Sequence, residues 1–282
     1  MRPAGLAVSA ALLLLFSAAV LLSAAVPAAM AKHQTGHDEE EEEFGYSPDA
    51  ENGPARWGEI KPEWAACGKG KMQSPIDLSS SRVSLARSLG HLNHSYRPAQ
   101  ATIVNSGHDV MVRFDGDAGS VSIDGTAYRL QQLHWHWPAE HTVDGRRYDM
   151  ELHMVHQSAH NKTAVVAVHY QIGAHDAFLH KLEPYLAMIA GQKDREENVG
   201  VVDPMGARGR ASVYYRYIGS LTAPPCSEGV IWTILKRVRT VSKHQLQLLR
   251  KAVNNEMDNA RPSQEMNNRD VSIFRPYGQN KN

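Results

Sequence analysis

Two short runs of the chain carry histidines at a spacing that suits metal binding. In an extended strand the side chains alternate between two faces, so His134 and His136 would point the same way, with Gln132 beside them. In the second run, His153 would share a face with Glu151. If the two strands pair, three imidazoles can converge next to an amide and a carboxylate. Three neutral nitrogen ligands that leave a fourth position open are typical of a catalytic zinc site, whereas a structural site is closed by a fourth protein ligand.

Histidine is abundant in this region, so the proposed metal ligands must differ from their neighbouring histidines in more than residue type. Twelve of the 15 histidines fall between His91 and His180, so a single histidine here carries little information. The triplet differs because Gln132 and Glu151 can accept the second ring N–H, which fixes the tautomer of a metal-bound imidazole. Four other histidines are expected at the surface: His91, His160, His175 and His180.

Composition and charge narrow the class of protein. The chain has 282 residues, of which 42% are hydrophobic and 21% charged, as in a globular protein with one large domain or two small ones. The formal net charge is zero, although Asp38–Glu43 is an unbroken run of acids. No segment is basic enough to indicate a nucleic-acid partner. We expect residues 32–45 to form an acidic, disordered leader.

The N-terminus has the pattern of a secretory signal peptide at residues 1–31. Arg2 is followed by an apolar stretch, Leu6–Val26, and by a small-x-small cleavage site at Ala29–Ala31. A retained signal anchor is the alternative, because the stretch is long enough to span a bilayer. With the signal removed, we expect no membrane anchor, since the C-terminus is polar. We expect an extracellular or apoplastic protein; a chloroplast reached through the secretory route is the alternative.

Two cysteines and two glycosylation sequons are consistent with passage through the secretory route. Cys67 and Cys226 are expected to form one disulfide, with two buried free thiols as the alternative. Closing so long a loop contributes about 4–5 kcal/mol in the chain-entropy model. Asn93 and Asn161 begin Asn-x-Ser/Thr tripeptides in polar, turn-like segments and are predicted glycosylation sites.

From Tyr46 to Gln279 the dominant pattern is short β-like runs broken by turn residues. Two segments have helical periodicity, 177–190 and 243–253, the second after Ser242 as N-cap. There is no repeat and no linker. The sequence therefore predicts one mainly β domain over residues 46–279, with a large, twisted, mostly antiparallel central sheet and a few short peripheral helices. The expected strands are 101–104, 110–114, 121–123, 128–136, 148–156, 163–172, 214–218 and 229–235.

Five motifs in order identify a family. The chain resembles the α-class carbonic anhydrases, in a secreted and plant-like form, from about Tyr46 to Arg269. Each motif alone is moderately specific, whereas the ordered set is highly specific. The motifs are Ser74–Asp77, Gln132–Trp137, Glu140–Asp144, Glu151–His156 and Gly219–Pro225.

The resemblance implies a zinc ion and its supporting groups. The ligands would be His134, His136 and His153. Gln132 would orient His134, Glu151 would orient His153, and the backbone carbonyl of Asn259 would orient His136.

The resemblance also implies roles around the metal. Thr222 would accept a hydrogen bond from zinc-bound hydroxide and donate its own to Glu140, which leaves a hydroxide lone pair directed at the substrate. His108 would be the proton shuttle, and Tyr46 and Asn105 would hold ordered water.

An apolar wall beside the metal is implied as well, although composition alone would make its residues ordinary strand core. Such a wall suits carbon dioxide, which offers no hydrogen bonds. Ala223 replaces a second threonine found in many animal members, which affects inhibitor and anion binding rather than the chemistry. The cysteine pair matches the disulfide of secreted members. The wall would comprise Val155, Val165, Leu221, Val230 and Trp232.

The implied activity is reversible hydration of carbon dioxide to bicarbonate and a proton by attack of zinc-bound hydroxide, with sulfonamides and anions as inhibitors. A weak esterase activity would be a side reaction. The alternative is a storage or binding protein of the same family with little activity; such members typically lack a ligand or the Thr–Glu pair. A peptidase-type zinc hydrolase is disfavoured because the sequence has no His-Glu-x-x-His.

Overall fold

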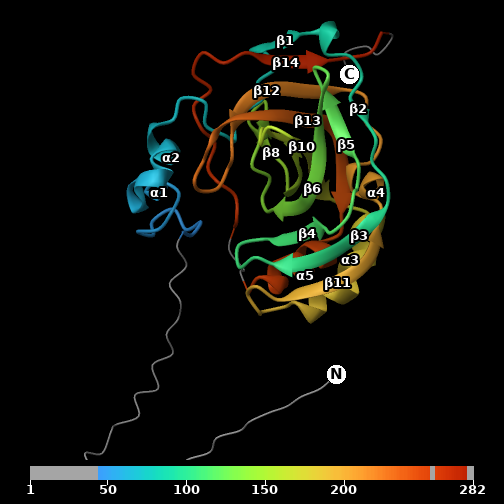
Figure 1. Ribbon diagram of the computed structural model, residues 1–282. Helices are drawn as coiled ribbons and strands as arrows, with labels where there is room; N and C mark the ends of the chain where they lie inside the picture. The colour runs from blue at the N-terminus through green and yellow to red at the C-terminus, as the bar shows by residue number, and fades with distance from the viewer. Residues whose placement is uncertain (1–43, 255–257, 278–282) are drawn as a thin grey trace, which may run out of the picture. The chain divides into compact units, whose positions relative to one another are not determined.

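The computed structural model describes residues 44–254 and 258–277 (Figure 1). The predicted signal peptide and the acidic run lie outside the described residues. Phe44 and Gly45, which the sequence places in the leader, belong to the packed domain. Trp57 Nε1 donates to the Gly45 carbonyl at 3.0 Å, and the Phe44 ring packs edge-on against Trp57 with centroids 5.5 Å apart. Aromatic packing therefore includes Phe44 and Gly45 in the domain.

One 12-stranded sheet forms the centre of the domain, as predicted. Only two strand pairs in its described part are parallel: β1 (Val83–Leu85) with β14 (Val271–Phe274), and β10 (Thr163–Ile172) with β13 (Glu228–Val241). The other pairs are antiparallel. β5 (Ser120–Ile123) pairs with β6 and with β2 (Asn93–His94), and β7 (Thr142–Val143) pairs with β8 (Arg146–Arg147) outside the sheet. The main path runs β1 (Val83–Leu85), β14 (Val271–Phe274), β12 (Tyr214–Ser220), β13 (Glu228–Val241), β10 (Thr163–Ile172), β9 (Met150–Ser158), β6 (Thr126–His136), β4 (Val110–Phe114), β3 (Ala99–Asn105) and β11 (Glu196–Val202).

The helices are short and peripheral. Both predicted helices are present, and the longer ends two residues earlier than its periodicity indicates. Ser242 caps the second with a full capping box, since its side chain accepts from Gln245 N and the Gln245 side chain accepts from Ser242 N. The helices are α1 (Trp57–Ile60), α2 (Ala66–Lys69), α3 (Ala177–Met188), α4 (Pro204–Arg208) and α5 (Lys243–Ala252), with 3₁₀ turns η1 (Pro62–Trp64) and η2 (Arg87–Leu89).

The central strands are buried on both faces. Val166 and Val168 of β10 belong to the larger core cluster, which includes residues of α3 and α5, and the alternate residues Val165 and Ala167 belong to a second cluster. Trp135 and Trp137 are fully buried in the larger core cluster, together with Phe178 and Leu182 of α3. These tryptophans alternate with the histidines along β6, so the core anchors the strand that carries the candidate ligands. Within the described residues, no helix is both long and apolar enough to cross a membrane.

Candidate metal centre and its pocket

Strand register brings the three predicted ligands together. In the antiparallel pair of β6 and β9, His134 lies opposite His153, and His136 lies opposite Glu151. The two histidines of β6 share a face because they are two residues apart. One nitrogen of each of the three rings lies within 4.8 Å of the others. His136 and His153 are buried, and His134 is partly exposed at the pocket surface.

Each of these histidines has one ring nitrogen committed to an oxygen acceptor. His134 Nδ1 lies 2.8 Å from Gln132 Oε1, His136 Nδ1 lies 2.7 Å from the Asn259 carbonyl, and His153 Nε2 lies 2.9 Å from Glu151 Oε1. Since these oxygens accept, the nitrogens must donate, and the lone pairs of the other nitrogens are directed at one another.

The remaining ring nitrogens fit a metal ion. His136 Nε2 is buried and has no hydrogen-bond partner, which is unfavourable unless a ligand satisfies it. Burial, together with the neighbouring imidazoles, lowers the pKa of His134 well below its ordinary value. Burial lowers the pKa of His153 as well. Neutral imidazoles are the form that binds metal, so the three residues suit a zinc ion with an open fourth position.

Glu151 is the centre of a network that the sequence did not reveal. Burial would raise the pKa of Glu151, but His141 and His169 beside it hold that pKa well below its usual value. His141 donates its backbone N–H to Glu151 Oε2 at 2.8 Å, and its Nδ1 lies 2.7 Å from Oε1. His141 Nε2 in turn lies 2.7 Å from the Tyr217 hydroxyl. The position of His141 next to Glu140 in a family motif was the available signal.

Glu140 and Thr222 are both buried. Glu140 Oε1 accepts from the backbone N–H of Arg261 at 2.9 Å, whereas Oε2 has no hydrogen-bond partner and lies 3.7 Å from His136 Nε2. Between the described Thr222 and Glu140 there is no hydrogen bond, so the expected pair stays a prediction. Oε2 is the acceptor that the Thr222 hydroxyl would have to reach.

A cavity of about 270 Å³ opens over the three histidines. Its lining is mostly apolar on the side formed by β9, β10, β13 and the loop after β12. Val230 is buried in the core behind this wall rather than on its surface. The predicted wall residues that line the cavity are Val155, Val165, Leu221, Ala223 and Trp232.

His108 and Tyr46 lie at the cavity as predicted, and the Phe44 ring stacks on His108 with centroids 4.2 Å apart. Asn105 does not line the cavity. Its side-chain amide donates to the carbonyls of Ile189 and Ala252, at 3.2 and 2.6 Å, and so attaches the end of β3 to the ends of α3 and α5. Its Oδ1 accepts from Gly107 N at 2.9 Å, which stabilises the turn before β4.

Ser106 and Asp109 line the cavity where Asn105 was expected. Ser106 Oγ donates to Asp109 Oδ1 at 2.8 Å, and burial raises the pKa of Asp109. Sequence reasoning missed both residues, although both lie in the turn that carries His108. An acid and a hydroxyl beside that histidine form a polar strip that leads from the metal site towards solvent.

The disulfide between Cys67 and Cys226 is confirmed, and the residues it links are 159 positions apart. It connects α2 to the loop that carries Thr222. Asn93 and Asn161 are both exposed, in positions that an attached glycan requires. The four predicted surface histidines are exposed, and two of them, His175 and His180, contact Glu183 at 2.7 and 3.1 Å.

Comparison with known proteins agrees with this geometry. A family model described as eukaryotic-type carbonic anhydrase matches residues 52–275. Alpha carbonic anhydrase 7 of Arabidopsis thaliana is 49% identical over 252 residues, which cover 89% of this chain and 91% of the relative. Dioscorin DB3S of Dioscorea polystachya is 48% identical over 235 residues, which cover 83% of this chain and 88% of the relative.

Solved structures extend the match to the fold. A dioscorin complexed with ascorbate superposes with a TM-score of 0.81 at 46% identity, covering 84% of this chain and all of that one. An α-carbonic anhydrase from Thermovibrio ammonificans, in complex with sulfanilamide, superposes with a TM-score of 0.75 at 36% identity, covering 81% of this chain and 98% of that one. The sequence motifs, the converging histidines and these matches lead to the same conclusion: the chain belongs to the α-carbonic anhydrase family.

Proposed function

We propose that the protein catalyses the reversible hydration of carbon dioxide to bicarbonate and a proton. The observation that carries the proposal is the histidine triplet, in which each ring has its own oxygen acceptor and one nitrogen of each ring lies within 4.8 Å of those of the other two. Zinc, bound by His134, His136 and His153, would lower the pKa of a water into the neutral range and so supply a nucleophile.

Thr222 and Glu140 orient that nucleophile. Glu140 is fully buried, and only one of its carboxylate oxygens is paired in the structure. With its hydroxyl hydrogen donated to Glu140 Oε2, Thr222 can only accept from the attacking water. The attacking lone pair is then directed into the cavity, where carbon dioxide lies.

The apolar wall admits the substrate and excludes competing solvent. Carbon dioxide is small, linear and without a net dipole, so a surface of Val155, Val165, Leu221 and Trp232 binds it loosely. The product bicarbonate is charged and leaves such a surface readily. Ala223 adds a methyl group to the cavity lining in place of a hydroxyl, so we expect anion and sulfonamide affinities to differ from those of members with threonine there.

His108 carries the proton out. It lines the same cavity as the histidine triplet, together with Tyr46, Ser106 and Asp109. An unperturbed imidazole has a pKa of about 6.5, so it accepts and releases protons readily at neutral pH. Ordered water along Tyr46, Ser106 and Asp109 would link His108 to the reacting water.

The remaining expectations follow from the same proposal. The similarity to a sulfanilamide-bound enzyme supports sulfonamide inhibition, and a weak esterase activity would use the same nucleophile. The confirmed disulfide supports a secreted protein, glycosylated at the exposed Asn93 and Asn161. The competing function is that of a storage or binding protein with little activity. The similarity to dioscorins is the observation that favours it.

Carbon dioxide hydration by the purified, zinc-analysed protein separates the two functions. The proposal predicts one zinc per chain and rapid hydration that sulfanilamide abolishes. If the protein binds zinc but hydrates carbon dioxide no faster than buffer alone, the storage or binding function would be favoured.

A further inference from the structure

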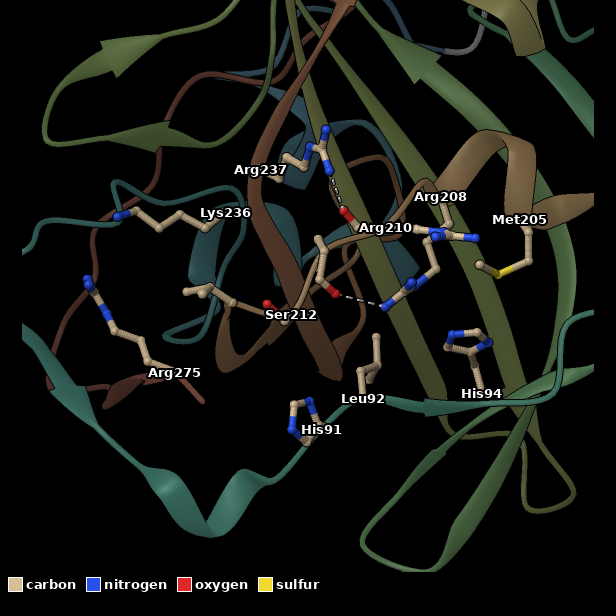
Figure 2. A pocket seen from close by; sticks show the side chains of 12 residues that line it. His91, Leu92, His94, Met205, Arg208, Arg210, Ser212, Lys236, Arg237 and Arg275 are labelled. Carbon is tan, nitrogen blue, oxygen red and sulfur yellow. Dashed lines mark hydrogen bonds between the residues drawn. The ribbon is translucent and has the colours of Figure 1, made fainter. Parts of the chain in front are cut away.

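A second cavity, separate from the metal centre, has an entirely basic set of charges. Its volume is about 700 Å³, and its lining shares no residue with the metal cavity. The lining comes from the chain after η2, from α4 and the loop after it, from β13 and from the segment after β14. Figure 2 shows cationic side chains on several sides of it. No lining residue is acidic, whereas five are cationic: Arg208, Arg210, Lys236, Arg237 and Arg275.

The cavity continues into a neighbouring one of about 570 Å³, which shares Arg208, Arg210 and Arg237 with it. This extension reaches Arg239 and contains one acid, Asp176. Asp176 is already paired, because its Oδ2 lies 2.6 Å from the Arg239 guanidinium. We call the two cavities together the basic groove; its excess charge comes from Arg208, Arg210, Arg237 and Arg275.

Arg208 is buried without a counter-ion. Only 5% of the residue is exposed, yet its guanidinium donates only to neutral carbonyls, those of Gly209 at 3.1 Å and Ala211 at 3.5 Å. Its Nε is buried and has no hydrogen-bond partner. Burial lowers the pKa of Arg208, the direction expected for a cation with no anion beside it. A buried, unpaired charge is costly and is compensated when an anion binds.

The other arginines of the groove are also uncompensated. Among the described residues, no carboxylate forms an ion pair with Arg210, Arg237 or Arg275, although the protein pairs exposed arginines elsewhere, for example Arg113 with Glu196 at 2.7 Å. Arg237 donates to the Arg210 carbonyl at 3.2 Å, which leaves its positive charge unneutralised, as with Arg208. The four like charges therefore repel one another, and an anionic ligand would relieve that repulsion.

We propose that the basic groove binds a linear polyuronate, an acidic polysaccharide with a carboxylate on each sugar unit. The cations are distributed along two joined cavities instead of converging on one point, so they match charges repeated along an extended ligand. Guanidinium groups bind carboxylates with two parallel hydrogen bonds. Binding here would hold the protein on an acidic matrix with its metal cavity free for carbon dioxide.

Other polyanions fit less well. No Phe, Tyr or Trp lines either cavity, so the bases of a single-stranded nucleic acid would have only the small imidazole rings of His91, His94 and His175 on which to stack. An anionic membrane is flat on this scale and would reach the rim rather than Arg208. Single-stranded nucleic acid and anionic membranes therefore serve as competing ligands in the binding test.

The test is titration of a fluorescently labelled oligogalacturonate with the full-length secreted protein, followed by anisotropy at low and physiological salt. All proteins carry Asn93→Gln, so that no glycan beside Leu92 and His94 covers the groove. The groove variant replaces Arg210, Lys236 and Arg275 with Ala and leaves the buried Arg208 in place. The control variant removes the same charge from exposed positions elsewhere, with Lys69, Arg129 and Lys251 replaced by Ala.

We expect binding that weakens with salt, an affinity about tenfold or more lower in the groove variant, and a change of less than about twofold in the control. Carbon dioxide hydration should be equal in all three proteins, since the two cavities share no residue. Equal losses in both variants would reduce the effect to net charge and overturn the proposal. Absence of binding at low salt, or stronger competition by sulfated dextran, single-stranded DNA or anionic vesicles than by unlabelled oligogalacturonate, would overturn it as well.

Discussion

The chemistry of this protein depends on a few residues whose positions follow from strand alternation. The two-residue spacing of His134 and His136 was enough to predict that they share a face, and the register of β6 and β9 places His153 opposite. A turn has no such rule. Asn105 ends β3 and Ser106 begins the turn after it, and only the fold shows that Ser106 lines the cavity while Asn105 donates to backbone carbonyls.

His108 is the residue whose role is most open to a direct kinetic test. His108→Ala should retain zinc and the interconversion of carbon dioxide and bicarbonate but slow turnover at saturating carbon dioxide. Without a shuttle, transfer to water from a group of pKa ~7 is limited to about 10³ per second, given a diffusional limit near 10¹⁰. Stopped-flow hydration in dilute buffer measures this step.

Added imidazole should restore much of the lost turnover, because a diffusible base replaces the missing side chain. The matched control is His160→Ala, which removes an exposed histidine that does not line the metal cavity. Equal turnover of the His108 variant and the wild type in dilute, non-transferring buffer would show that His108 is not the shuttle.

At the scale of elements, the sequence predicted features that are encoded locally, such as helix starts, better than the pairing of strands that are far apart in the chain. Ser242 and Gln245 form the expected start of α5, because a capping box is encoded within four residues. The parallel pairing of β10 with β13 was not predictable in the same way. It joins strands separated by α3, β11, α4 and β12, and nothing local to either strand encodes the partner.

The disulfide is the element-scale link between α2 and the Thr222 loop. Reduction, or replacement of Cys67 and Cys226 by Ser, should lower the free energy of unfolding by up to about 4–5 kcal/mol, because a long loop in the unfolded chain is no longer closed. It should also lower the hydration rate, since the Thr222 loop loses its attachment. Chemical denaturation and stopped-flow assays measure the two effects.

The metal content serves as the control in that experiment, because neither cysteine contacts the histidine triplet. Loss of stability with unchanged hydration would show that the disulfide supports the fold but does not position Thr222. Two free thiols in the secreted protein would contradict the bridge itself.

At the scale of the whole molecule, the distribution of charge is the property that the sequence concealed. The formal net charge is zero, and no basic cluster is dense enough to indicate a nucleic-acid surface. The cations of the basic groove come from α4, the loop after it, β13 and the segment after β14, and only folding brings them together. A scan for charge runs therefore predicted the absence of a nucleic-acid surface but had no means of locating this groove.

Acid sensitivity is a further property of the whole fold. His156 is fully buried, with its Nε2 2.7 Å from the Tyr96 hydroxyl, and burial lowers its pKa to about 4. The folded-state pKa lies below the unfolded value of about 6.5, so the unfolded chain binds the proton more tightly. Stability is therefore unaffected above pH ~6.5 and falls as the pH drops from ~6.5 to ~4, by roughly 2 kcal/mol at pH ~5.

His156→Gln should remove the part of the acid-induced loss of stability that comes from His156. This holds even if the substitution also lowers the unfolding free energy at neutral pH. The measurement is the difference in unfolding free energy between pH ~7 and ~5 for the variant and the wild type, by chemical denaturation. An equal difference in both proteins would show that other groups govern the acid response.

The central claim, a zinc-dependent hydration of carbon dioxide at His134, His136 and His153, is tested most directly by hydration rate against zinc occupancy. Zinc is removed with a chelator and returned in steps, and metal content and stopped-flow hydration are measured on each sample. We predict no activity in the stripped protein, a linear rise that ends at one zinc per chain, and neither zinc nor activity in His153→Ala while the far-ultraviolet spectrum of the β-sheet persists. Full activity in the stripped protein or in metal-free His153→Ala would contradict the account.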